Sequence, residues 1–220
     1  MAFTAHAQTL GLRLILVGDS TMAPRSGYGN ALCQSLDKLA CLNLARGGRS
    51  SKSFRAEGLW SSVLTLLREG GHRNLVLIQF GHNDMPGKPG RSTDLATEFG
   101  PNLAAYVEEL RAVGAHPVLI TPLTRRNFSQ GTLQNDLRPW AEVTLRVAAE
   151  LEVPVVDLNA LSAATVQALG PAGADTLALA APQFDRTHLG NAGAALFAEQ
   201  VLHALLKLHP ELGPALSNSP

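Results

Sequence analysis

The sequence has no net charge and no long apolar run. Its 18 lysines and arginines balance its 18 aspartates and glutamates, so no basic surface indicates a nucleic acid or an anionic membrane as a partner. No stretch approaches the roughly 20 apolar residues that cross a bilayer. Aromatic residues make up only 5% of the chain, which leaves few side chains for stacking on sugars. The composition therefore argues against nucleic-acid binding, membrane insertion and sugar binding by stacking alone.

Cysteine is also scarce, because only Cys33 and Cys41 occur. Their spacing matches no metal-binding pattern and provides no disulfide framework. Cysteine is often simply a small buried hydrophobe, so we predict two buried free thiols rather than a bridge. The amino terminus lacks an intact signal peptide, although Ala5-His6-Ala7 resembles the small-residue end of a cleaved one. The compartment stays open between the cytoplasm and a mature secreted form.

What the sequence does contain is an alternation of strand-like and helix-like segments. With 220 residues, 45% of them hydrophobic, the chain is long enough for one well-buried core. We predict a single domain over residues 1–220, with its core at about 12–208. Strand-like apolar runs occupy residues 12–17, 42–44, 74–80, 117–121 and 154–157. Apolar residues at helical spacing occupy residues 31–40, 59–68, 95–113, 139–150 and 191–206.

This alternation predicts a three-layer α/β fold. Strands separated by helices form a parallel sheet covered on both faces, so we expect a doubly wound, flavodoxin-like α/β/α domain with a mostly parallel sheet of about five strands. The glycine- and proline-rich stretches 85–92 and 170–173 are predicted as loops, and the tail after His209 as dispensable for chemistry. Loops that follow the strands of such a sheet gather at one edge, where these folds bind their ligands.

Two short segments contain the residue types that acyl transfer needs. Ser20, in Gly18-Asp19-Ser20-Thr21-Met22, directly follows the first apolar run, and His188 ends Asp185-Arg186-Thr187-His188. A serine hydroxyl is a weak nucleophile until a base takes its proton and an acid orients that base. We predict that Ser20 is the nucleophile, His188 the base and Asp185 the orienting carboxylate. This combination indicates a serine esterase that needs no cofactor.

Other titratable residues near these segments have simpler interpretations. His72 precedes the third strand, at the edge of the sheet opposite the predicted site. His82 is better explained as a residue that supports its own loop than as a catalytic base. His82, Asp84, Asp185 and His188 lack the His-Glu-x-x-His spacing of a metal site, and the predicted triad already uses two of them, so we predict no metal. Asp19 suits a structural role, since its carboxylate can accept N–H bonds in its own loop.

The predicted oxyanion hole consists of the backbone N–H groups of Ser20 and Gly48 and the side-chain amide of Asn83. Acyl transfer requires donors aimed at the developing oxyanion. Gly48 follows the second strand, in Gly47-Gly48-Arg49-Ser50, and Asn83 follows the third, in Gly81-His82-Asn83-Asp84. Glycine at position 48 lets the backbone approach a substrate without a Cβ in the way.

Taken in order, these segments resemble the four sequence blocks of the SGNH, or GDSL-type, hydrolase superfamily. Gly18-Asp19-Ser20, Gly48, Gly81-His82-Asn83-Asp84 and Asp185-Arg186-Thr187-His188-Leu189 match the blocks, and the similarity runs from about Leu14 to about Phe197. Further residues resemble rhamnogalacturonan acetylesterases: Thr21-Met22, Arg49-Ser50, Ser53-Phe54, Thr121-Pro122 and Arg125-Arg126. The resemblance implies an enzyme that removes acetyl groups from an O-acetylated plant polysaccharide, most simply rhamnogalacturonan or its pectic fragments.

Three arginines complete the candidate site. Arg49 follows Gly48, and Arg125 and Arg126 follow the fourth strand. Each is either a solvated surface residue or a substrate-binding residue, because a guanidinium can hold the carboxylate of an acidic sugar through two parallel bonds. Two other functions stay open. One is a generic short-chain carboxylesterase, thioesterase or acetylxylan esterase of the same superfamily, and the other is a non-catalytic carbohydrate-binding module.

Overall fold

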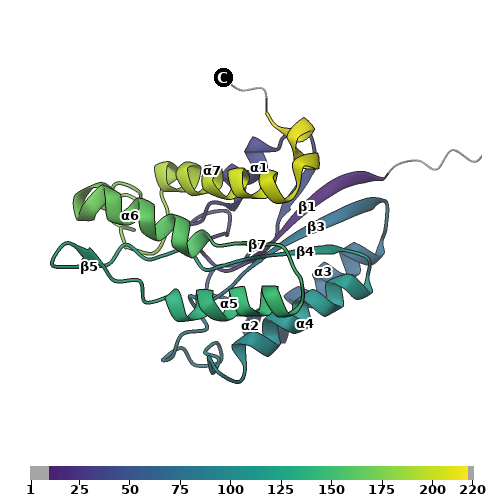
Figure 1. The fold of residues 1–220 in the computed structure, drawn as a ribbon, viewed down its shortest axis with the longest axis horizontal. Coiled ribbons are helices and arrows are strands. Elements are labelled where there is room, and N and C mark those ends of the chain that lie inside the picture. The colour runs from purple at the N-terminus through teal and green to yellow at the C-terminus, as the bar shows by residue number, and fades with distance from the viewer. Residues whose placement is uncertain (1–9, 218–220) are drawn as a thin grey trace, which may run out of the picture.

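A five-stranded parallel sheet forms the centre of the protein (Figure 1). The computed structural model describes residues 10–217, so the Ala5-His6-Ala7 triplet lies outside the described residues. Across the sheet the strands follow the order β2-β1-β3-β4-β7. Their bounds are β1 (Gly11–Gly18), β2 (Ala40–Asn43), β3 (His72–Gln79), β4 (His116–Ile120) and β7 (Val155–Val156). The predicted α/β fold class and the number of strands are confirmed.

Hydrophobic side chains cover both faces of this sheet. In β1, Leu14 and Leu16 belong to one core cluster, and Ile15 and Val17 belong to the other, because successive side chains of a strand point to opposite faces. One face packs against α1 (Gly29–Ser35), α6 (Leu158–Asp175) and α7 (Asn191–Leu208) (Figure 1). The other packs against α2 (Ser53–Ala56), α3 (Leu59–Arg68), α4 (Phe99–Ala112) and α5 (Arg138–Glu150).

Helix α6 and a short hairpin are missing from the sequence-based prediction. Residues 170–173, predicted as a loop, lie within α6, so that prediction is wrong. Only Gly170 leaves helical geometry, with φ 66° and ψ 177°, and Pro171 then suits the first turn of a second helical segment. Alanine and glycine blur the apolar periodicity of this helix. The antiparallel strands β5 (Phe128–Ser129) and β6 (Thr132–Leu133) are too short to produce a pattern.

The two cysteines form a disulfide, so the prediction of free thiols is wrong. Cys33 in α1 and Cys41 in β2 have Cα atoms 5.4 Å apart and a bonded sulfur pair. The chain reverses direction between Ser35 and Ala40, which brings the last turn of the helix beside the first residues of the strand. Composition alone carries no information about this reversal, which decides whether two thiols meet.

The segment after His209 packs against the domain. A 3₁₀ helix, η1 (Pro210–Ala215), buries Leu212 and Ala215, and Ser217 Oγ donates a hydrogen bond to the backbone O of Gln34 in α1. This tail therefore contributes to one face of the core, far from the carboxyl edge of the sheet. In the described part of the chain, none of the helices has the length and hydropathy needed to cross a membrane.

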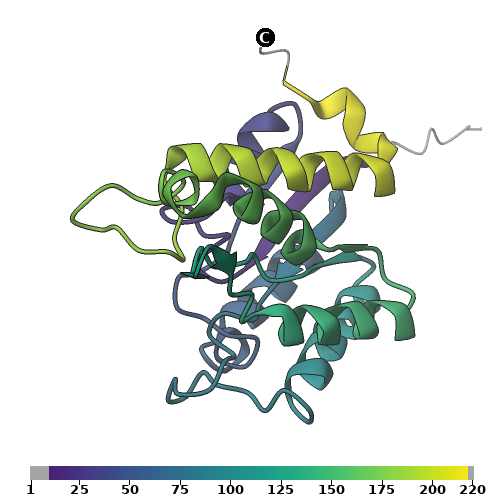
Figure 2. The same ribbon diagram turned by 60° about the vertical axis from the view of Figure 1, so that its left-hand side comes forward.

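The loops that carry the candidate residues meet at the carboxyl edge of the sheet. The strands run toward the left in Figure 1, where the loops after β1, β3 and β4 and the β5–β6 hairpin lie. The loop between α6 and α7 reaches the same edge and projects away from the helices in Figure 2. This convergence agrees with the general placement of ligand sites in open α/β sheets.

Candidate active site

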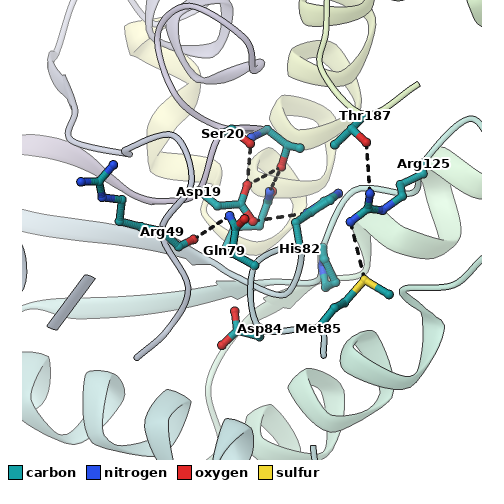
Figure 3. Close-up of polar contacts among 12 residues, drawn as sticks. Asp19, Ser20, Arg49, Gln79, His82, Asp84, Met85, Arg125 and Thr187 are labelled. Atoms are coloured by element: carbon teal, nitrogen blue, oxygen red, sulfur yellow. Dashed lines mark hydrogen bonds and ion pairs between the residues drawn. The ribbon is translucent and has the colours of Figure 1, made fainter. Parts of the chain in front are cut away.

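Ser20 lies at the carboxyl end of β1, in a tightly packed turn. A Cβ atom on Gly18 would come within 2.7 Å of the backbone O of Gln79, so only glycine fits there without a shift. The buried carboxylate of Asp19 closes the turn, because its Oδ1 accepts hydrogen bonds from the backbone N and the Oγ1 of Thr21, both at 2.8 Å. Ser20 itself is 8% exposed. The turn therefore fixes the serine backbone at the sheet edge (Figure 3).

Ser20, His188 and Asp185 form a continuous hydrogen-bonded row. The Nε2 atom of His188 lies 2.9 Å from Ser20 Oγ, and its Nδ1 lies 2.6 Å from Asp185 Oδ2. The other carboxylate oxygen, Oδ1, accepts bonds from the backbone N–H groups of Thr187 and His188, both at 2.7 Å. One carboxylate thus shapes the loop before α7 and also orients the imidazole.

The surroundings of Asp185 favour its ionised form. Partial burial opposes ionisation, but the side-chain and backbone hydrogen bonds from His188 and the backbone bond from Thr187 outweigh it and lower the pKa of Asp185. An ionised carboxylate accepts a hydrogen bond from Nδ1–H, which keeps the proton on Nδ1 and leaves Nε2 free to take a proton from Ser20. This arrangement can activate a serine hydroxyl.

The predicted oxyanion donors come from two loops that are bonded to each other. Asn83 Nδ2 donates to the backbone O of Arg49 at 3.0 Å, which leaves the second amide hydrogen for a ligand. Gly48 has a φ of 78°, a left-handed conformation that strains any residue with a Cβ. Within residues 10–217, the backbone N–H groups of Ser20 and Gly48 donate to no other residue. All three predicted donors therefore have a free N–H.

The side-chain carboxylate of Asp84 links these two loops. Its Oδ1 accepts hydrogen bonds from the backbone N and Oγ of Ser51, at 3.1 and 2.5 Å, and from Thr93 Oγ1 at 3.2 Å. Burial raises the pKa of Asp84 to about 6, although the bonds from Ser51 and Thr93 act in the opposite direction. These contacts indicate that Asp84 stabilises the two loops, whereas the sequence suggested only a metal-binding role for it, which was rejected.

His82 pairs with Asp19 beneath the serine. The Nδ1 atom of His82 lies 3.3 Å from Asp19 Oδ2, with both side chains buried (Figure 3). Burial opposes ionisation of Asp19, but the charge and hydrogen bond of His82, with the bonds from Thr21, lower the pKa of Asp19. His82 thus contacts the turn of Ser20 and not its Oγ, which fits the loop-supporting role predicted for it. His72 begins β3, at the opposite edge of the sheet.

The three candidate arginines have three different places. The Arg49 guanidinium points away from Ser20 in Figure 3 and pairs with Glu57, from Nε at 2.8 Å and Nη2 at 2.7 Å. Its Nη1 donates to the backbone O of Gly47 at 2.8 Å. Arg125 lies between Thr187 and Met85, beside the candidate site (Figure 3). Both guanidiniums are therefore bonded to protein groups, since Arg125 Nε also lies 3.4 Å from Asp136 Oδ2, and Arg125 is the one that lies beside the candidate site.

Arg126 requires a correction, because its side chain is fully buried. Its Nη2 donates to the backbone O of Asp185 at 2.9 Å and of His188 at 2.7 Å. The backbone N of Arg126 donates to the backbone O of Arg186 at 2.8 Å. A substrate cannot reach this guanidinium, so Arg126 is not a substrate-binding residue. It holds the backbone of the loop that carries His188.

Two cations beside the site were missed by sequence reasoning. Lys88 Nζ donates to the backbone O of His82 and to Asn83 Oδ1, the latter at 3.3 Å. Arg91 Nη1 donates to the backbone O of Gly48 at 3.3 Å. The available signal was weak: two basic residues in a glycine- and proline-rich loop directly after the Asn83 segment. In the described part of the chain, no cluster of three or more His, Cys, Asp or Glu side chains is arranged to hold a metal.

The α/β fold brings a serine, a histidine and an aspartate into contact at one edge of the sheet, and comparison with known proteins gives the family. The chain belongs to the GDSL-like lipase/acylhydrolase family, whose model matches residues 16–196. This confirms the resemblance inferred from the four sequence blocks.

Several relatives are acetylesterases by name. Rhamnogalacturonan acetylesterase RhgT of Bacillus subtilis (strain 168) is 32% identical over 216 residues, which cover 90% of each chain. The rhamnogalacturonan acetylesterase of Emericella nidulans is 30% identical over 225 residues, covering 92% of this chain and 86% of the relative.

Solved structures share the fold. Bacillus subtilis YxiM superposes with a TM-score of 0.78 at 27% identity; the match covers 91% of this chain and spans 57% of the YxiM chain. An acetylxylan esterase of Geobacillus stearothermophilus superposes with a TM-score of 0.65 at 19% identity, covering 96% of this chain and 100% of that one. At this identity the second likeness concerns the fold alone.

Proposed function

We propose that this protein is a serine esterase that removes acetyl groups from O-acetylated carbohydrate, with rhamnogalacturonan as its substrate. The observation that carries the proposal is the row from Ser20 Oγ through His188 to Asp185, with distances of 2.9 and 2.6 Å. The names of the two rhamnogalacturonan acetylesterases at 30% and 32% identity support the substrate class.

The proposed reaction begins when His188 Nε2 takes the proton of Ser20 Oγ as that oxygen attacks the acetyl carbonyl carbon. The carbonyl oxygen becomes an oxyanion, which the N–H groups of Ser20, Gly48 and Asn83 stabilise. When the intermediate collapses, the carbon–oxygen bond to the sugar breaks and His188 returns its proton to the departing sugar oxygen. The products of this half-reaction are the free sugar hydroxyl and an acetyl-serine.

Water then completes the cycle through the same groups. His188 takes a proton from a water molecule, the resulting hydroxide attacks the acetyl-serine, and the second tetrahedral intermediate collapses to acetate. The proton on His188 returns to Ser20 Oγ, which restores the enzyme. Asp185 stays ionised throughout and stabilises the imidazolium that forms twice in each cycle.

The direct test is acetate release from acetylated rhamnogalacturonan, acetylated xylan and the small ester 4-nitrophenyl acetate. We expect the highest kcat/KM on rhamnogalacturonan, and we expect Ser20→Ala to lower turnover by roughly 10⁴-fold or more. Ser61→Ala, on the exposed surface of α3, is the matched control and should retain full activity. Preference for acetylated xylan would replace the substrate assignment, and a folded Ser20→Ala variant with full activity would overturn the mechanism.

A further inference from the structure

Among residues 10–217, only one phenylalanine, tyrosine or tryptophan is exposed to solvent. This residue is Phe184, which is 46% exposed, whereas the other aromatic residues of the described chain are buried or half-buried. Phe184 directly precedes Asp185, in the loop between α6 and α7. A single apolar residue on a protein surface is ordinary, but this one lies next to the residue that orients the candidate base. Its position therefore points to a contact with the ligand of the same site.

The tip of this loop presents an uncharged surface. The four residues before Phe184, at positions 180–183, have the sequence Ala-Ala-Pro-Gln and are all exposed. The loop projects from the body of the protein in Figure 2, so these residues stand clear of the helices. Such a surface fits a neutral ligand, because it provides no partner for an ionised group that would lose its water on binding.

The loop is anchored where it returns to the active site. The backbone O of Asp185 accepts a hydrogen bond from Arg126 Nη2 at 2.9 Å. The next residue, Arg186, pairs with Asp175 at the end of α6, from Nε to Oδ1 at 3.0 Å and from Nη2 to Oδ2 at 3.1 Å. These bonds fix the backbone directly after Phe184 before a ligand arrives, so less conformational entropy is lost when a ligand binds.

We propose that Phe184 is a platform for a neutral sugar ring of the substrate, next to the sugar whose acetyl group lies at Ser20. This inference rests on the proposed function, because it names how the polysaccharide is held at the same site. One face of a pyranose ring presents several C–H groups, which pack against an aromatic ring through dispersion and through removal of apolar surface from water. The phenyl ring has no polar atom, so it recognises this apolar face and not a hydroxyl or a carboxylate.

A ring on this platform also shields the triad from water. The side chains of Asp185 and His188 are 44% and 34% exposed, whereas Ser20 is 8% exposed. Because Phe184 is the neighbour of Asp185 in the chain, a sugar that packs on it covers part of this open side. The bond between Asp185 Oδ2 and His188 Nδ1 is stronger with less water around it, since electrostatic attraction rises as the local dielectric constant falls.

Kinetics on two substrates test the platform. The substrates are acetylated rhamnogalacturonan and ethyl acetate, which has neither a sugar nor an aromatic ring. Phe184→Ala should lower the ratio of kcat/KM on the polymer to kcat/KM on ethyl acetate by about 10-fold, the effect of losing the burial of half an aromatic side chain. Phe184→Trp should keep the native ratio. Leu208→Ala is the matched control, because it removes an apolar residue that is 41% exposed at the far end of α7, and it should not change the ratio.

Fluorescence tests the contact without turnover. Phe184→Trp introduces an exposed indole, whereas Trp60 and Trp140 are buried. The substitution is combined with Ser20→Ala, so that an acetylated rhamnogalacturonan oligosaccharide stays intact during the measurement. The oligosaccharide should lower acrylamide quenching of the introduced tryptophan toward that of the buried pair. A tryptophan introduced by Leu208→Trp in the same background should gain no protection.

The outcomes separate the platform from the proposed function. Equal relative losses on the polymer and on ethyl acetate would mean that Phe184 only positions Asp185, and equal protection of the two introduced tryptophans would mean unspecific binding; either result overturns the platform. Protection that grows with protein concentration in the absence of sugar would assign the loop tip to a contact between two copies of the chain, and also overturns it. If the oligosaccharide protects the tryptophan but the native enzyme releases no acetate from the polymer, the platform stands and the proposed function fails. If acetate is released and Phe184→Ala leaves the ratio unchanged, the proposed function stands and the platform fails.

Discussion

Arg126 offers a sharp test of how the site is held together. Its fully buried guanidinium donates to the backbone oxygens of Asp185 and His188, at 2.9 and 2.7 Å. A hydrogen bond that involves a charged group contributes about 1.5–3 kcal/mol to stability. Loss of both bonds should therefore lower the free energy that holds this loop in its native conformation by roughly 3–6 kcal/mol. Arg126→Met keeps much of the apolar volume of the side chain and deletes both bonds. We therefore expect the loop to shift and His188 to leave its position 2.9 Å from Ser20 Oγ.

The expected kinetic effect is a loss in kcat. A misplacement of a reacting group by about 1 Å costs on the order of 100-fold in rate, so Arg126→Met should lower kcat on 4-nitrophenyl acetate by about that factor. Acetylated rhamnogalacturonan should show the same relative loss, because Arg126 does not meet the substrate. Arg111→Met, which removes an exposed arginine bonded to the backbone O of Leu151, is the control. An increase in KM for the acidic polymer alone, with kcat intact, would refute this assignment and return Arg126 to substrate binding.

Four further predictions address the donors, the base, a buried carboxylate and the disulfide. Asn83→Ala should lower kcat by roughly 10²–10³-fold through loss of one oxyanion donor, and a change confined to KM would contradict it. Because the pKa of Asp185 is lowered, it stays ionised in mild acid, and a pH–rate profile should show a single loss of activity as the histidine base is protonated; an optimum near pH 3 would exclude this base. Burial raises the pKa of Asp84 from 3.8 to about 6, so the folded state binds this proton more tightly. The resulting stabilisation, roughly 3 kcal/mol, is complete below pH 4 and is lost as the pH rises through 6. Asp84→Asn should lack this pH dependence in urea unfolding, and identical profiles would refute it. The double substitution Cys33→Ser and Cys41→Ser removes a disulfide between residues that are eight positions apart in sequence. It should lower the free energy of unfolding by about 2–3 kcal/mol, and equal denaturation midpoints for the two proteins would contradict this.

The sheet and most helices could be predicted because their residues carry a local pattern. Strands β1 and β3 contain short apolar runs, residues 14–17 and 75–78, that are buried on both faces of the sheet, and α3 has the predicted bounds of residues 59–68. Helix α6 has no such signal, because small residues and the Gly170–Pro171 break interrupt its periodicity. The disulfide depends on the reversal of the chain between α1 and β2, which is a property of tertiary structure.

Within the site, the sequence could indicate the reacting groups but not the side chains around them. Ser20, Asp185 and His188 are chemically distinctive and follow a recognisable order. Arg125 and Arg126 are adjacent and identical in type, yet the first lies beside the site and the second is fully buried. Only the three-dimensional path of the loop after β4 decides which guanidinium faces inward.

Bonds between neighbouring loops explain why residues that never touch substrate should affect turnover. Ser26 Oγ donates to the backbone O of Ser20 at 2.7 Å, and the backbone O of Ser26 accepts from the N–H of Leu189, next to His188, at 2.9 Å. Asp84 similarly joins the Asn83 loop to the loop of Gly48 through Ser51. Each reacting group is therefore positioned by a bond from another loop, as well as by its own strand. Because catalysis depends on distances within a few tenths of an ångström, the tolerance of this site to mutation is set by these connections as much as by the triad itself.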